Sequence, residues 1–99
     1  MIRSVIRLQV VPGQERAFED QFRQRGVLKR AREVARMRTG ELLRPLAGGS
    51  YVVVATWDSA EDYAVWINSP VRAELSATPP QLSQPAAPAD LYEIVERFE

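Results

Sequence analysis

Few side chains in this 99-residue chain could do chemistry, because it contains no cysteine and no histidine. Their absence excludes disulfides, thiolate catalysis, iron-sulfur clusters, Ser-His-Asp triads, cysteine-containing zinc sites and haem ligated by histidine. No remaining side chain has an unperturbed pKa near 7, so proton transfer at neutral pH needs a perturbed carboxyl, a tyrosine, water or the substrate itself. We therefore expect no metal, no cofactor and little acid–base chemistry from the protein.

Aromatic side chains between residues 57 and 67 are the clearest candidates for a site. The indoles of Trp57 and Trp66 could stack on a flat substrate, or they could fill core volume. The Tyr63 phenol could orient or protonate a substrate oxygen, or it could lie at the core boundary. Asn68 follows on the same segment, and in the simpler interpretation it makes only local hydrogen bonds at a helix end.

Hydrophobic periodicity in the first half of the chain predicts a strand followed by two short helices. Residues 2–10 alternate apolar and polar side chains, with one distinctly apolar face. Apolar residues at helical spacing follow over residues 14–25 and 27–35, and Gly26 is expected to break the helix between them. The first helix is expected to turn four charged residues away from its apolar side, namely Glu15, Glu19, Asp20 and Arg23.

The middle of the chain predicts a β-hairpin. Residues 41–46 and 51–57 are expected to pair across a loop over residues 47–50. The second strand lacks alternation, which indicates that both its faces are covered. Successive side chains of a strand point to opposite faces. On this basis one face, turned toward the helices, is expected to carry Tyr51, Val53, Ala55, Trp57 and Leu42, and the opposite face is expected to carry Val52, Val54 and Leu43.

The last third of the chain predicts a helix, a long loop and a final strand. Ser59 and Asp62 have capping-box spacing, so a helix should begin there and end near Ser69-Pro70. Four prolines are expected to exclude regular structure over residues 77–90, and a loop of that length is usually functional or interfacial. A last strand is expected over residues 91–98.

This order of elements predicts one domain over residues 1–99. It is satisfied by an α+β, ferredoxin-like fold, in which helices cover one face of a four-stranded antiparallel sheet. The other face would then be bare, and a second copy packed sheet to sheet is the economical cover. We therefore expect a homodimer.

The distribution of charge along the chain indicates which classes of partner it could bind. Lysine and arginine number 13 against 13 aspartate and glutamate, which argues against nucleic acid. Residues 23–38 nevertheless hold seven basic side chains and only Glu33, either a solvated face or a docking surface for phosphate or an acyl carrier protein. No signal peptide or membrane-spanning segment is recognised, so we expect a cytoplasmic protein.

Three segments carry a resemblance to a known family. WDSAEDYAVWINSP (residues 57–70), VPGQERAF (11–18) and YEIVE (92–96) resemble the antibiotic biosynthesis monooxygenase family. The resemblance implies a dimeric α/β barrel of two ferredoxin-like subunits, each with a pocket between sheet and helices. Members include cofactor-independent monooxygenases that oxidise aromatic polyketides to quinones, haem-degrading enzymes and proteins of no established activity, while polyketide cyclases and isomerases share the wider fold.

The resemblance also implies site residues for the quinone-forming members. Their strand-end tryptophan and helix tyrosine correspond to Trp57 and Tyr63. Their asparagine falls on Val53, and their arginine falls on Ser76, with Arg72 four residues away. Two of the four groups are therefore missing.

The haem-degrading members fit less well. Trp66 matches their helix tryptophan, but their asparagine and axial histidine fall on Ile6 and Ser76. Haem degradation by that scheme is not expected.

The resemblance and the residues together predict a cofactor-independent oxygenase for an anthrone or naphthol. Tyr63 and Arg72 are then the candidate catalytic residues, the first binding the substrate oxygen and the second stabilising the developing anion. The expected partners are a second copy, the aromatic substrate and O2, with an acyl carrier protein as a further candidate. A cyclase or isomerase and a non-catalytic ligand-binding dimer are the alternatives. The candidate substrate-binding residues are Trp57, Trp66, Tyr51, Val53 and Asn68.

Overall fold

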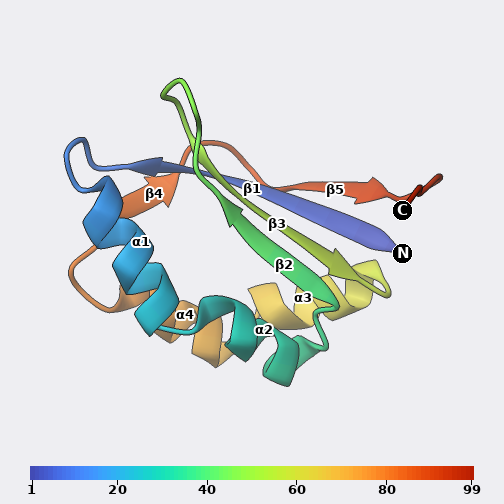
Figure 1. Cartoon of the computed structure of the whole chain (residues 1–99). Helices are drawn as coiled ribbons and strands as arrows, with labels where there is room; N and C mark the ends of the chain where they lie inside the picture. The colour runs from blue at the N-terminus through green and yellow to red at the C-terminus, as the bar shows by residue number, and fades with distance from the viewer.

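All the helices lie on one side of an antiparallel sheet in the computed structural model, which describes residues 1–99 (Figure 1). Strand β1 (Ile2–Val10) pairs with β3 (Tyr51–Trp57), which pairs in turn with β2 (Thr39–Leu43). The other edge of β1 is occupied by two short strands, β4 (Ser83–Pro85) and β5 (Asp90–Glu93). This architecture confirms the predicted ferredoxin-like α+β class, with the fourth strand position divided between β4 and β5.

Four short helices connect the strands. Helices α1 (Glu15–Gln24) and α2 (Val27–Ala35) follow β1, whereas α3 (Ala60–Ile67) and α4 (Pro70–Ala77) follow β3. The break between α1 and α2 occurs at Gly26, whose φ of 59° lies in the left-handed region that glycine adopts at little cost. The predicted break at this residue is therefore confirmed.

Serine side chains cap the second pair of helices. The Ser59 hydroxyl accepts a hydrogen bond from the Asp62 N–H, as the capping-box spacing predicts. The Ser69 hydroxyl accepts from the Arg72 N–H and donates to the Trp66 carbonyl, so it joins the end of α3 to the start of α4. Pro70 at the first turn of α4 needs no hydrogen-bond acceptor there. A further helix therefore begins at Pro70, next to the point where the preceding helix was expected to end.

Strands β2, β4 and β5 also differ from the prediction, and proline accounts for the first two differences. Strand β2 ends at Leu43 rather than residue 46, and Pro45 lacks the N–H that a longer ladder would need. The proline-rich segment was expected to lack regular structure, but β4 lies within it and Pro85 pairs with Leu8. An edge strand tolerates proline because its outer side makes no ladder bonds. The final strand stops at Glu93 instead of residue 98.

The main core lies between the end of β3 and helices α2 and α3. Trp57 is 1% exposed, and its indole N–H donates to the buried Ser4 hydroxyl at 2.9 Å. The Tyr63 ring packs edge to face against Trp57, with 5.6 Å between the ring centroids. The buried members of this core cluster are Ala31, Ala35, Met37, Ala55, Trp57, Tyr63 and Trp66.

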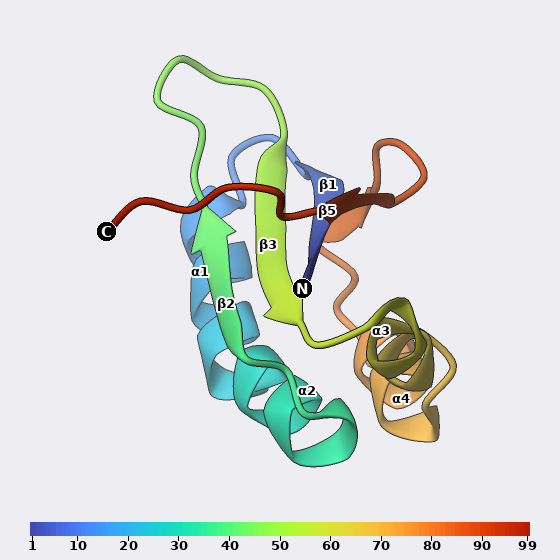
Figure 2. The same cartoon turned by 90° about the vertical axis from the view of Figure 1, so that its right-hand side faces the viewer.

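The opposite face of the sheet carries no helix (Figure 2). The register places Val52 beside Leu43 on one side and Arg7 on the other, so these three side chains share that face. Leu43 is 44% exposed there. Arg7 makes an ion pair with Asp90 at 3.0 Å across the neighbouring strand. This face is therefore a mixture of apolar and charged side chains that no element of the chain covers.

None of the helices is long and apolar enough to span a lipid bilayer.

We expect Ser4→Ala to lower the free energy of unfolding by about 1–3 kcal/mol, because it leaves the buried Trp57 N–H without an acceptor. Urea denaturation followed by circular dichroism would measure this loss, with the exposed Ser76→Ala in α4 as a control. In a Trp57→Phe background, which has no N–H to satisfy, the cost of Ser4→Ala should vanish. An equal cost in both backgrounds would contradict this role for the hydrogen bond.

Candidate functional site

A cavity of about 520 Å³ lies between the α1–α2 junction and strands β2 and β3. Its volume is in the range of small-molecule sites. Phe22, Val27, Leu28, Leu42 and Tyr51 supply its apolar lining, and Glu19, Arg23, Lys29, Arg44 and the Gly26 backbone complete it.

The cavity exists because α1 contacts the sheet mainly at one end. Phe18, which is buried, packs edge to face on Tyr51 with 5.1 Å between ring centroids. Phe22 lies one helical turn further on, and its ring centroid is 6.1 Å from that of Phe18. It is half-buried and lines the cavity, and beyond it the chain turns at Gly26 into α2. The turn therefore leaves space between the two helices and the sheet.

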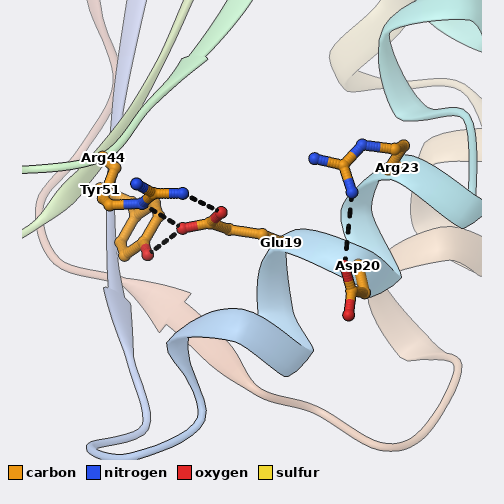
Figure 3. Close-up of polar contacts among 5 residues, drawn as sticks. All are labelled: Glu19, Asp20, Arg23, Arg44 and Tyr51. Atoms are coloured by element: carbon orange, nitrogen blue, oxygen red, sulfur yellow. Dashed lines mark hydrogen bonds and ion pairs between the residues drawn. The ribbon is translucent and has the colours of Figure 1, made fainter.

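Three of the residues that line this cavity, Glu19, Arg44 and Tyr51, form a hydrogen-bonded cluster. Their side chains converge from helix α1 and from the sheet side (Figure 3). The Glu19 carboxylate accepts from Arg44 Nε at 2.6 Å and from Arg44 Nη2 at 2.5 Å. The Tyr51 hydroxyl donates to the same carboxylate at 2.5 Å. Only 16% of the Glu19 side chain is exposed, whereas 68% of Arg44 is exposed. Helix α1 is thus joined to the sheet by a bidentate ion pair and a phenol.

The cluster determines the ionisation of its three members. The hydrogen bonds from Arg44 and then from Tyr51 lower the pKa of Glu19 from 4.5 to about 2. Burial raises the pKa of Tyr51, and its bond to the Glu19 carboxylate raises it further. The same carboxylate raises the pKa of Arg44. At neutral pH the cluster therefore holds a carboxylate, a guanidinium and a neutral phenol, and Glu19 is too weak a base to remove a substrate proton.

The position of Glu19 corrects the expectation that it faces away from the apolar side of α1. It follows Phe18 directly and precedes Phe22 by three residues, so it shares their edge of the helix. The Tyr51 hydroxyl and Arg44 give its carboxylate partners there. Asp20 is exposed, as expected, and pairs with Arg23 at 3.3 Å (Figure 3), but Arg23 also lines the cavity, so the expectation is wrong for Arg23 as well.

Tyr51 is the one predicted site residue that lines the cavity. Trp57, Tyr63 and Trp66 come together instead in the core cluster, at 1%, 8% and 5% exposure. Burial raises the pKa of Tyr63, and the positive charge of Arg72 acts in the opposite direction. The predicted aromatic and arginine residues are therefore near one another but are closely packed.

The two remaining predicted residues lie apart from this group. Val53 is half-buried in the middle of β3, on the face of the strand opposite to that of Val52 and Val54. Asn68 is exposed at the end of α3, where its backbone N–H bonds to the Ala64 carbonyl. Neither lines the cavity.

The basic segment over residues 23–38 is largely engaged within the chain. Arg25 donates to the carbonyls of Leu75 and Thr78 at 2.8 and 2.6 Å, which ties α1 to α4. Arg38 makes a bidentate ion pair with Asp58 at 2.8 and 3.0 Å. Lys29 makes no ion pair and lies on the cavity, so it is the basic residue of the segment that is free to meet a ligand.

The cavity can hold a flat apolar molecule between the side chains of Phe22, Leu28 and Leu42. Lys29 and Arg44 place positive charge beside it, which favours the anionic form of a bound acid or phenol. No three carboxylates, histidines or cysteines converge anywhere in the chain as a metal site would require. The arrangement is suited to holding an aromatic anion rather than to protein-based proton transfer.

A family model described as antibiotic biosynthesis monooxygenase matches residues 1–77 of the chain. No match was found among proteins of curated function.

Several solved structures share the fold. The haem degrader MhuD of Mycobacterium tuberculosis, with two haems in its active site, is 24% identical at a TM-score of 0.76, and all of both chains is covered. SnoaB, a cofactor-independent oxygenase of Streptomyces nogalater, is 20% identical at 0.77, with 97% of this chain and 94% of that chain covered. HapK of Hahella chejuensis is 11% identical at 0.78, with 100% and 97% covered.

The lowered pKa of Glu19 predicts a pH-dependent stability. A carboxylate with a pKa of about 2 in the folded chain stabilises it at every pH above about 4.5, and this contribution is lost as the pH falls from 4.5 to 2. Glu19→Gln should therefore lower the free energy of unfolding by about 1 kcal/mol at pH 7, and by progressively less below pH 4.5.

Urea titrations of both proteins at pH 7, 4 and 3 would measure this difference. Glu33→Gln, an exposed position on α2 that makes no ion pair, is the matched control and should show no such trend. A difference that stays constant from pH 7 to pH 3 would contradict the role given to the Glu19 carboxylate.

Proposed function

The chain belongs to the antibiotic biosynthesis monooxygenase family, and from this we propose that it oxidises an electron-rich aromatic molecule, of anthrone or naphthol type, to a quinone without a cofactor. The observation that carries the proposal is the cavity of about 520 Å³ beneath α1 and α2, which is lined by apolar side chains and by three basic residues, Arg23, Lys29 and Arg44, against the single carboxylate of Glu19. Such a site favours a bound aromatic anion, which is the species that reacts directly with O2.

The reaction balances with O2 as the only co-reactant. Loss of a proton from the reacting CH₂ group of an anthrone gives a carbanion, which transfers electrons to O2 and forms a C–O bond. The peroxide anion so formed takes up a proton to become a hydroperoxide, which loses water to leave the quinone carbonyl. One substrate and one O2 thus give one quinone and one water, and the substrate supplies all the electrons.

The residues of the cavity would then have distinct roles. Phe22, Leu28 and Leu42 hold the aromatic plane and exclude water, so the charges nearby act in a medium of low dielectric constant. Lys29 and Arg44 stabilise the anion that forms on loss of the proton. The proton passes to water, because the pKa of Glu19, about 2, is too low for this carboxylate to take it.

The residues predicted from the sequence define a competing location. Tyr63, with Arg72 nearby, would meet a substrate only if the packed aromatic rings of Trp57 and Trp66 separated to admit it. We therefore place the substrate in the cavity and treat Tyr63 as a core residue. Variants at the two locations distinguish the alternatives.

Oxygen uptake with an anthrone substrate tests the activity. We expect one O2 consumed per anthrone and no turnover without O2. Lys29→Ala should lower kcat/KM about tenfold, whereas Arg30→Ala, the next and equally exposed position of α2, should leave it within twofold. Tyr63→Phe should have little effect, because it keeps the ring.

Other outcomes would contradict the proposal in different ways. Loss of activity in Tyr63→Phe or Arg72→Ala, with Lys29→Ala unaffected, would move the site to the core cluster. Anaerobic conversion of a linear ketide would indicate a cyclase or isomerase. Anthrone binding without oxygen uptake or conversion would indicate a ligand-binding protein.

We also propose that a second copy covers the open face of the sheet. Val52 and Val54 lie in the middle of that face, between the more exposed Leu43 and the arginines of β1. Leu43 and Tyr92 are 44% and 53% exposed on it, which is unfavourable for a face left in water. The family resemblance implies the same sheet-to-sheet association.

Sedimentation equilibrium at micromolar concentration should therefore show a dimer. Val54→Asp should dissociate it, because a charge would be buried at the centre of the interface. Val65→Asp, on the exposed side of α3, makes the same change outside the interface and should remain dimeric. A folded monomer of the unaltered chain would contradict the proposal.

A further inference from the structure

A second cavity continues the first along helix α1. It has a volume of about 330 Å³ and is lined by Glu15, Arg16, Pro45 and Gly48 together with three residues of the first cavity. The shared residues are Glu19, Arg44 and Tyr51, the members of the hydrogen-bonded cluster. The two cavities therefore meet at this cluster.

The spacing along α1 shows that the cluster lies between the cavities. Arg16 of the second cavity precedes Glu19 by three residues, and Phe22 of the first cavity follows it by three. Positions three residues apart lie one above the other on a helix face, about one turn of 5.4 Å pitch from each other. Glu19 is thus the middle position of a continuous face that borders both cavities.

The opposite side of the groove has the same order. Leu42 of strand β2 lines the first cavity, Arg44 borders both, and Pro45 and Gly48 line the second. The bidentate contact between Glu19 and Arg44 therefore joins helix α1 to the residue that follows β2 (Figure 3), and both of its members border both cavities.

We infer that the Glu19–Arg44 ion pair is a partition that sets the length of the aromatic substrate. With the pair formed, the site takes a molecule no longer than the first cavity. With the pair broken, the two cavities form one groove along α1 that accepts an extended polycyclic molecule. This inference rests on the proposed function in one respect: the first cavity is taken as the substrate site.

Arg44 is the member of the pair that can move. Its side chain is 68% exposed, and it begins the loop over residues 44–50, where Gly48 and Gly49 have φ of 79° and 109°. Ion pairs with an exposed member are weak, because water competes for the charge. Glu19 is only 16% exposed and is also bound by the Tyr51 hydroxyl, so it stays in place when Arg44 leaves.

Two anionic fluorophores of the same chemistry test the inference by binding alone. 1-Anilinonaphthalene-8-sulfonate (ANS) is the shorter probe, and its covalent dimer, bis-ANS, is the longer one. In Arg44→Ala and in Glu19→Gln, the affinity for bis-ANS relative to ANS should rise about tenfold or more. Bis-ANS carries two sulfonates and ANS carries one, so charge alone would lower this ratio in Arg44→Ala and raise it in Glu19→Gln. A rise of the ratio in both variants therefore reports the length of the site rather than its charge.

Glycine amides in ¹H–¹⁵N spectra report where the probes bind. Gly26 borders the first cavity and Gly48 the second, and the chain has only five glycines. ANS should shift the Gly26 amide alone in the unaltered protein, and bis-ANS should shift both amides in the two variants. Arg38→Ala, which breaks a bidentate ion pair of the same kind with Asp58 outside the groove, should leave the affinity ratio unchanged.

The outcomes separate this inference from the proposed function. An unchanged affinity ratio with Gly26 shifted, or bis-ANS shifting both glycines equally in the unaltered protein, would overturn the partition. If neither probe shifts Gly26 in any variant, the first cavity is not a ligand site, and the proposed placement of the substrate fails with it.

Discussion

The attachment of helix α1 to Tyr51 is the constraint on which the rest of the site depends. Phe18 packs on the Tyr51 ring, and Glu19 accepts the Tyr51 hydroxyl, so two successive residues hold the helix to strand β3. Beyond this attachment the chain turns at Gly26, and α1 and α2 leave a cavity above the sheet. These two contacts fix the height of α1 above the sheet beside Tyr51, and the hydrogen bonds from Arg25 to the carbonyls of Leu75 and Thr78 hold its other end.

The packed core and the two cavities therefore lie in different parts of the fold. Its packed aromatic residues lie under α2 and α3, where the indole of Trp57 bonds to Ser4 and the ring of Tyr63 packs against it. The region under α1 contains charged and half-buried side chains and the two cavities described above instead. A domain of this size buries only part of its surface, so space is left beside its packed core.

Local sequence signals predicted most of the fold, and pairings over long separations explain what they missed. The alternation in β1, the break at Gly26 and the cap at Ser59 depend on neighbouring residues and were predicted correctly. Strand β4 was missed because it contains Pro85. A strand tolerates proline only at the edge of a sheet, and the local sequence does not show that this segment lies at an edge. Among the site residues only Tyr51 was predicted at the cavity, because Glu19 and Arg44 are 25 residues apart and no local pattern joins them.

A crystal structure of the protein soaked with an anthrone in the absence of O2 would show where the substrate lies, because it would bind without turning over. We expect its ring system between Phe22, Leu28 and Leu42, with its oxygen directed toward Lys29 or Arg44. Density for the anthrone among Trp57, Tyr63 and Trp66, with the cavity beneath α1 and α2 unchanged, would contradict it.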